Sequence, residues 1–115
     1  ASDARGSFEE LYKSSKWGQI SENISYPGIT KGGHYHKYKK EIFYTVVGQC
    51  RIRQRNVQTD EIKEDLVSGD NPHPVDIITG YTHEITNVGS ENSRTIMWIS
   101  EVYNEKTADT YKESV

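Results

Sequence analysis

Short runs of strand-forming residues, separated by turn signals, constrain the fold of this chain more than any other feature. Four segments are rich in Val, Ile, Tyr, Trp and Thr, and in several of them polar and apolar residues alternate: residues 18–26, 41–47, 49–57 and 94–102. A period of two is typical of strands with one buried face. Turn signals fall between them, as in "YPG", "SGDNP", "TGY" and "VGSENS". With almost no helical periodicity, the pattern predicts an all-β sandwich or barrel.

Composition narrows the class of protein. The chain has 115 residues, which predicts a single domain, residues 1–115, and only 33% of them are hydrophobic, so the core must be thin. No apolar stretch is long enough to span a bilayer, so we expect no membrane partner. A net charge of −3 argues against nucleic acid as the main partner, because phosphate backbones recruit basic surfaces. The single Cys50 excludes an internal disulfide, which predicts a cytoplasmic location.

The histidines carry the strongest chemical signal. In a strand, His34 and His36 would project from the same face, and Glu41 opens the next strand candidate. His83 heads another strand candidate after a Gly turn. Three imidazoles and one carboxylate suit zinc, iron, manganese, nickel or cobalt. The alternative is that all four are solvated residues of edge strands. The remaining histidine, His73, lies in the Pro-flanked loop "NPHPV", where we expect it to face solvent or a partner.

These residues resemble a known family. The first cupin motif is matched without departure by Gly28, His34, His36, Glu41 and Gly48. The second motif is matched by Gly80, His83 and Asn87, with Ile78 at the position usually held by a turn proline. Within the cupin superfamily, the chain is most similar to the C-terminal domain of bifunctional capsular polysaccharide-assembling enzymes of the CapF type. The phrases "ISYPGITKGGHYH", "VDIITGYTHEITNVG" and "DTYKESV" carry that resemblance over nearly the whole chain.

The resemblance implies a fold, a cofactor and partners. It implies a double-stranded β-helix, or jelly roll, that binds a divalent metal, with zinc favoured. It further implies epimerisation at C3 of a UDP-linked 4-keto-6-deoxy sugar, which an NADPH-dependent reductase then reduces. The reductase would be fused or separate, because this sequence has no dinucleotide-binding fingerprint. The family also implies a homodimer, with residues 1–25, around Phe8 and Leu11, at the contact. Residues 103–115 would form an extended or partly frayed C-terminal arm.

The proposed chemistry needs acid/base groups on both sides of the sugar, since inversion removes a proton from one face and returns it to the other. Tyr81 has the same strand parity as His83, which predicts that it points into the same cavity. Lys31 and Tyr44 are weaker candidates, because their parity differs from that of the nearest metal ligands. The ordinary alternatives are that tyrosines on β surfaces pack and that lysines face water.

Substrate binding is predicted for Lys31 and Arg53. The pattern Arg51-x-Arg53-x-Arg55 puts three guanidinium groups on one strand face, where they could hold a nucleotide diphosphate. The alternative is a solvated face paired with the acidic run at 60–65.

Two other functions stay open at this level. A metal-binding cupin could recognise a small sugar or anion without catalysis, or serve as a dimerisation module. Iron-dependent oxygen chemistry would use the same ligand set.

Overall fold

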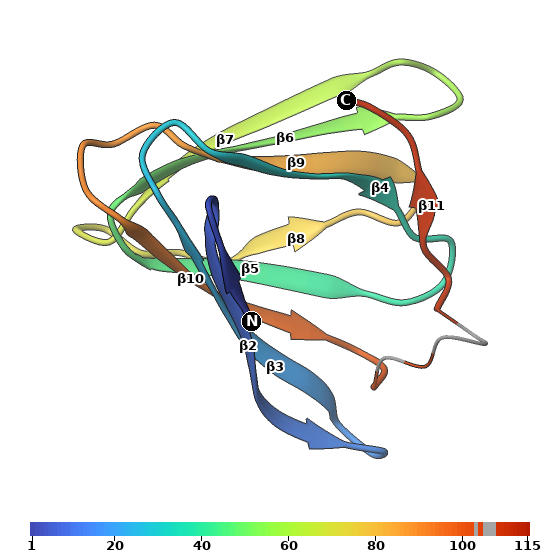
Figure 1. Ribbon diagram of the computed structural model, residues 1–115. Helices are drawn as coiled ribbons and strands as arrows, with labels where there is room; N and C mark the ends of the chain where they lie inside the picture. Colours follow the sequence, from blue (N-terminus) through green and yellow to red (C-terminus); the bar gives the residue numbers. More distant parts are fainter. Residues whose placement is uncertain (103, 105–107) are drawn as a thin grey trace.

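The computed structural model describes residues 1–102, 104 and 108–115, and it confirms the all-β prediction. Two antiparallel sheets face each other (Figure 1). The strands of the first sheet, in spatial order, are β1 Ser2–Asp3, β2 Gly6–Ser14, β3 Gly18–Ser25, β10 Ser93–Ile99, β5 Glu41–Val47 and β8 Val75–Ile77. Those of the second are β11 Tyr111–Lys112, β4 Thr30–Tyr35, β9 Tyr81–Asn87, β6 Gln49–Asn56 and β7 Ile62–Ser68.

The four predicted segments correspond to β3, β5, β6 and β10. The strands β7 and β8 had no predicted counterpart. β7 is an exposed edge strand with the sequence "IKEDLVS", and β8 has only three residues, so neither shows a clear alternation. Of the expected C-terminal arm, residues 103 and 105–107 lie outside the described residues, and β11 pairs with β4. Among the described residues no helix is long and apolar enough to cross a membrane.

The core lies between the two sheets and is as thin as the composition requires. Its buried apolar members are Phe43, Cys50, Ile52, Val67, Val75, Ile77 and Ile85. Polar side chains complete the interior by pairing with one another: the hydroxyls of Thr45 and Thr95 lie 2.9 Å apart. Gln54 is fully buried, donates to the carbonyl of Asp76 and accepts from the backbone N–H of Ile78. Such satisfied polar groups fix the spacing of the sheets where apolar residues run out.

A β-bulge in β4 decides which side chains of that strand face the interior. Lys31 pairs with Ile85 and Gly32 with Glu84, but the next pair is His34 with His83. Gly32 and Gly33, with φ of 120° and 80°, absorb the extra residue in conformations that favour glycine. Because the bulge resets the alternation, Lys31 and His34 both lie beside inward-facing residues of β9, despite their odd separation in sequence.

Candidate metal centre

Three histidines converge at one end of the space between the sheets. His34 comes from β4, His36 follows directly after that strand, and His83 comes from β9. One ligand nitrogen from each lies within 4.8 Å of the other two. His83 is only 2% exposed and His36 only 4%, whereas His34 is half-buried. Imidazoles from two strands and one loop therefore meet at one point.

The carboxylate of Glu41 comes to the same point from the opposite sheet. Glu41 is the first residue of β5, and its Oε1 lies 3.1 Å from His36 Nε2 and 3.6 Å from His83 Nε2. Three imidazole nitrogens and one carboxylate oxygen thus face one another, which is a donor set that suits zinc and other first-row divalent metals. The residues present therefore fit a metal ion.

The protonation states also favour metal binding. Burial lowers the pKa of His83 to about 4, and burial is the main cause of the lowered pKa of His34. Burial alone would raise the pKa of Glu41, but its 3.1 Å contact with His36 and the nearby imidazoles lower it overall. At neutral pH His34 and His83 are therefore neutral and Glu41 is ionised, the forms that ligate a cation.

Two cavities adjoin this cluster. The larger has a volume of about 440 Å³ and is lined on its polar side by Glu10, Gln19 and Lys39. The smaller, of about 220 Å³, contains Lys31 and Asn23. His34, Glu41, Phe8 and Met97 line both. A bound ion would therefore lie between two spaces that are lined by different polar groups.

Lys31 lies in the smaller cavity, contrary to the parity argument that made it a weak candidate. Its Nζ donates to Asn23 Oδ1 at 2.7 Å and to the carbonyl of Ile24 at 3.0 Å. Burial lowers the pKa of this amine. Lys31 lies in this cavity because the bulge at Gly32 and Gly33 places it on the same face of the sheet as His34.

The structure does not bring Tyr81 to the cavities, so the prediction that it shares the space of His83 is wrong. Tyr81 is the first residue of β9 and pairs with Asn56 at the end of the sheet. From there its hydroxyl reaches over the β6–β7 loop and donates to Glu61. That hydrogen bond is the main cause of the raised pKa of Tyr81, which opposes a role as a base. The other tyrosine candidate, Tyr44, is exposed.

The structure also places Arg53 away from the cluster, on the outer face of β6. Its neighbours Ile52 and Gln54 point inward and are fully buried, so Arg53 must point outward. There its Nε lies 3.2 Å from a carboxylate oxygen of Glu64, which belongs to the acidic run at 60–65. Of the two alternatives for the arginine face, Arg53 therefore follows the second, in which it pairs with the acidic run.

Several residues beside the cluster gave no signal in the sequence. Asp109 contacts His36 through its carbonyl and the loop after His36 through its carboxylate. Lys39 is 4% exposed and lines the larger cavity, although the "KYKK" stretch is typical of a solvated turn. Only the long-range pairing of β11 with β4 places Asp109 near the site, and no local pattern encodes that pairing. His73 is exposed and outside the cluster, as expected.

Two facing sheets with histidines and a glutamate gathered between them at one end define the protein as a cupin. The chain belongs to the family described as polysaccharide biosynthesis C-terminal domain, which matches residues 1–111. Capsular polysaccharide assembling protein CapF from Staphylococcus aureus is 50% identical, with a TM-score of 0.97 over 100% of this chain and 34% of that chain. Both the cupin fold and the resemblance to CapF-type enzymes are thus confirmed.

Curated relatives agree with this assignment. UDP-2-acetamido-2,6-beta-L-arabino-hexul-4-ose reductase of Pseudomonas aeruginosa is 40% identical over 114 residues, covering 99% of this chain and 31% of its own. Spore coat polysaccharide biosynthesis protein SpsL of Bacillus subtilis is 27% identical over 118 residues, covering 94% of this chain and 78% of its own. The chain spans about a third of CapF and of the reductase. The Mycobacterium tuberculosis rmlC epimerase shares the fold, with a TM-score of 0.71 at 15% identity over 87% of this chain and 52% of that chain.

Proposed function

We propose that this chain epimerises C3 of a UDP-linked 4-keto-6-deoxy sugar during the biosynthesis of a capsular or other surface polysaccharide. The observation that carries the proposal is the cluster of His34, His36, His83 and Glu41 between two cavities, in a chain of this family. The 4-keto group makes the C3 proton removable once the negative charge that develops on oxygen is stabilised.

The four clustered residues would hold one divalent ion, most simply zinc. When bound, the ion would supply a positive charge next to the developing oxyanion and so lower the barrier to enolisation. The residues themselves fix where the sugar can lie, because Phe8 and Met97 line both cavities and would contact its apolar surfaces.

Lys31 replaces Tyr81 as our candidate for a proton-transfer group. Its amine lies in the smaller cavity beside the cluster, and burial lowers its pKa. Lys39 lines the larger cavity and is the candidate for the second group. Two amines in different cavities beside the same cluster would suit removal and return of a proton on opposite faces of C3.

Association of the chain follows from the same proposal. Exposed apolar residues gather on the β2–β3 hairpin, at the edge of the six-stranded sheet: Phe8, Leu11, Tyr12 and Trp17. We expect two chains to bury this surface in a homodimer, since exposed edges with apolar residues favour pairing. Light scattering should give about twice the 13.2 kDa chain mass at micromolar concentration, and a monomer mass would exclude the dimer. An NADPH-dependent reductase, fused or separate, would then act on the product.

Proton NMR of the chain with a UDP-4-keto-6-deoxy sugar in deuterated water tests the function. Exchange at C3 should occur without NADPH, because enolisation moves protons and needs no hydride. The His36→Ala variant should lose exchange together with its metal. Lys31→Met should slow exchange by about 100- to 10,000-fold, as loss of one acid/base group does, and should keep its metal content.

The binding-module alternative gives a different result in the same assay. A chain that binds both metal and sugar but exchanges no proton would be a recognition or dimerisation domain instead. Wild-type exchange in the Lys31→Met variant would remove only Lys31 from the mechanism.

A further inference from the structure

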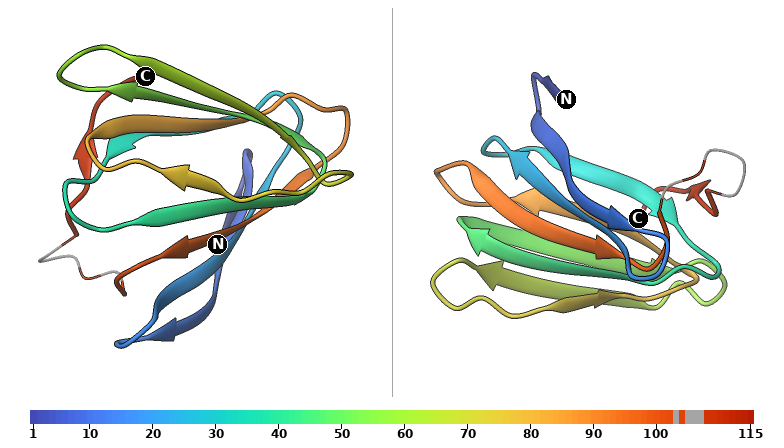
Figure 2. Two further views of the ribbon diagram at one scale, coloured as in Figure 1. Left: turned by 180° about the vertical axis from the view of Figure 1, so that it is seen from behind. Right: turned by 90° about the horizontal axis from the view of Figure 1, so that it is seen from below.

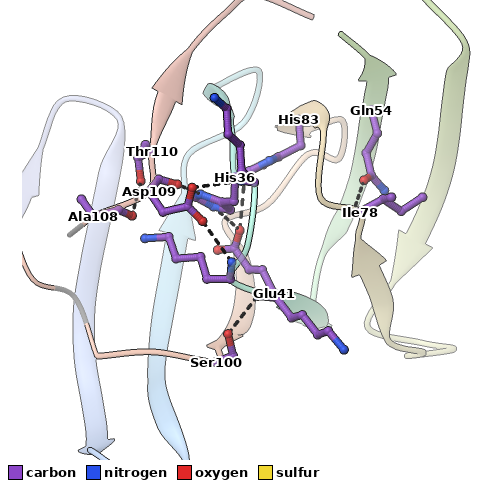
Figure 3. Close-up of polar contacts among 12 residues, drawn as sticks. His36, Glu41, Gln54, Ile78, His83, Ser100, Ala108, Asp109 and Thr110 are labelled. Carbon is purple, nitrogen blue, oxygen red and sulfur yellow. Dashed lines mark hydrogen bonds and ion pairs between the residues drawn. The ribbon is translucent and has the colours of Figure 1, made fainter. Parts of the chain in front are cut away.

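The ring of His36 is fixed by a contact from the far end of the sequence. His36 Nδ1 lies 2.8 Å from the carbonyl oxygen of Asp109 (Figure 3). A carbonyl only accepts hydrogen bonds, so Nδ1 must carry the proton and donate it. The other nitrogen, Nε2, then faces Glu41 at 3.1 Å. By contrast, His83 Nδ1 is buried without a hydrogen-bond partner among the described residues.

The side chain of Asp109 fixes the loop between two of the proposed ligands. Its Oδ1 accepts from the backbone N–H of Lys37 at 3.0 Å. Its Oδ2 accepts from Tyr38 and Lys39 at 2.8 and 3.0 Å. Because this loop joins His36 to Glu41, one residue controls both the orientation of an imidazole and the backbone that positions the carboxylate.

Asp109 is itself held by the strand that follows it. Its φ of 50° is left-handed, a conformation that aspartate tolerates better than most residues. Tyr111 pairs with Tyr35 in β4 and stacks on its ring, with the ring centroids 5.2 Å apart. The backbone N–H of Glu113 donates to the carbonyl of Gly33 at 2.9 Å, beside the bulge. The segment therefore reaches the cluster as an added edge strand of the same sheet (Figure 2).

We infer that Asp109 is a positioning residue of the metal centre, whose carbonyl sets the tautomer of His36 and whose carboxylate holds the loop leading to Glu41. The inference rests on the metal site of the proposed function. Groups that orient metal-ligating histidines typically change metal affinity by about 10- to 100-fold. Asp109 would act through His36 and Glu41, without touching metal or substrate.

Zinc affinity of the metal-stripped chain, measured by competition with a chromophoric chelator, tests the inference. Asp109→Ala should weaken zinc binding by about 10- to 100-fold. Asp109→Asn should lose less, since asparagine tolerates the left-handed conformation and keeps an acceptor for the loop. Asp60→Ala is the matched control: Asp60 also has a positive φ, of 63°, and its carboxylate pairs with Arg55 on the outer face. Its zinc affinity should equal that of the wild type.

Imidazole ¹⁵N NMR of the metal-free chain gives an independent readout. The Nδ1 proton of His36 should be protected in the wild type and in Asp60→Ala, and should exchange rapidly in Asp109→Ala. Equal zinc affinity in Asp109→Ala and the wild type would overturn the inference, as would an equal loss in Asp60→Ala. If Asp109→Ala does not fold, the Asp109→Asn variant is measured instead. Zinc affinity and imidazole NMR signals in that variant equal to those of the wild type would count against a positioning role. Failure of the wild type to bind zinc would instead overturn the metal site and this inference together.

Discussion

The inner and outer faces of the sheet β11-β4-β9-β6-β7 both carry ionisable side chains, yet these side chains are neutralised differently. On the outer face, Arg53 pairs with Glu64, and Arg55 pairs with Asp60 and Glu113. On the inner face, His83 and its neighbours meet a single carboxylate from the other sheet. The outer charges are balanced by groups on their own sheet, in contact with solvent.

The inner cluster is arranged differently. His34 and His83 are neutral and Glu41 is ionised, so these three residues together carry a largely buried negative charge. A divalent cation would neutralise that charge and occupy the facing lone pairs, whereas the arginine face requires no added group. The role inferred for an ionisable residue therefore depends more on which face of the strand it occupies than on its type.

The largest expected effect is a loss of bound metal when two histidines of the inner cluster are removed. The double variant His34→Ala/His83→Ala should lose nearly all bound metal, because two of the four proposed donors disappear. Elemental analysis of protein purified without added metal measures this, with about one ion per chain expected in the wild type. The double variant Arg51→Ala/Arg53→Ala is the control from the outer face and should keep its metal. Wild-type metal content in the histidine variant would place the ion elsewhere.

The bulge in β4, which changes which side chains face inward, can be tested by substituting its two glycines separately. A Cβ at Gly32 would lie 2.5 Å from the carbonyl oxygen of His83, whereas a Cβ at Gly33 would meet nothing closer than 3.9 Å. Both glycines have positive φ, so both alanine variants carry backbone strain. Gly32→Ala adds a clash with the backbone of His83 and should reduce the free energy of unfolding by about 4 kcal/mol. Gly33→Ala should cost about 1–2 kcal/mol.

Urea unfolding of the two variants measures the difference. Equal losses would mean that strain alone matters and that the close approach of β4 to β9 relaxes. A larger loss in Gly32→Ala would tie the bulge directly to the position of His83.

The bulge also explains why the sequence predicts the members of the inner cluster better than it predicts the residues around them. His34, His36, Glu41 and His83 follow a spacing that the cupin motifs share, and β9 pairs with β6 without a register shift. Lys31 lies on the other side of a bulge, so counting by twos assigned it to the wrong face. Tyr81 has the right parity but stands at the end of its strand, where parity no longer sets the direction of a long side chain. Asp109 depends on a pairing across most of the chain.

The pH dependence of stability should reveal the buried imidazoles of the inner face. The folded-state pKa of His83 is about 4, below its ordinary value of 6.5, so the unfolded chain binds the proton more readily. The free energy of unfolding of the metal-free chain should therefore fall as pH decreases from 6.5 to about 4, by up to roughly 3 kcal/mol. Below 4.5, protonation of Glu41 removes further stability, because its pKa is lowered in the folded state.

Denaturant unfolding at several pH values, in the presence of a chelator, checks this dependence. The His83→Gln variant should show a shallower slope, since it lacks the group that titrates. A wild-type curve that stays flat from pH 6.5 to 4.5 would mean that His83 can take up a proton without leaving its place.

Substitution of an arginine on the outer face should have the smallest effect on the free energy of unfolding. Arg53 is about a third exposed, and its partner Glu64 is more exposed still. Exposed ion pairs typically contribute about 0–1 kcal/mol, because water and salt screen them. Arg53→Ala should therefore change the free energy of unfolding by no more than about 1 kcal/mol, and less at high salt. It should also leave metal content and C3 exchange unchanged, because Arg53 points away from both cavities. A large loss of exchange with normal stability would return Arg53 to the substrate site, and would require the nucleotide to reach across the edge of the sheet to its outer face.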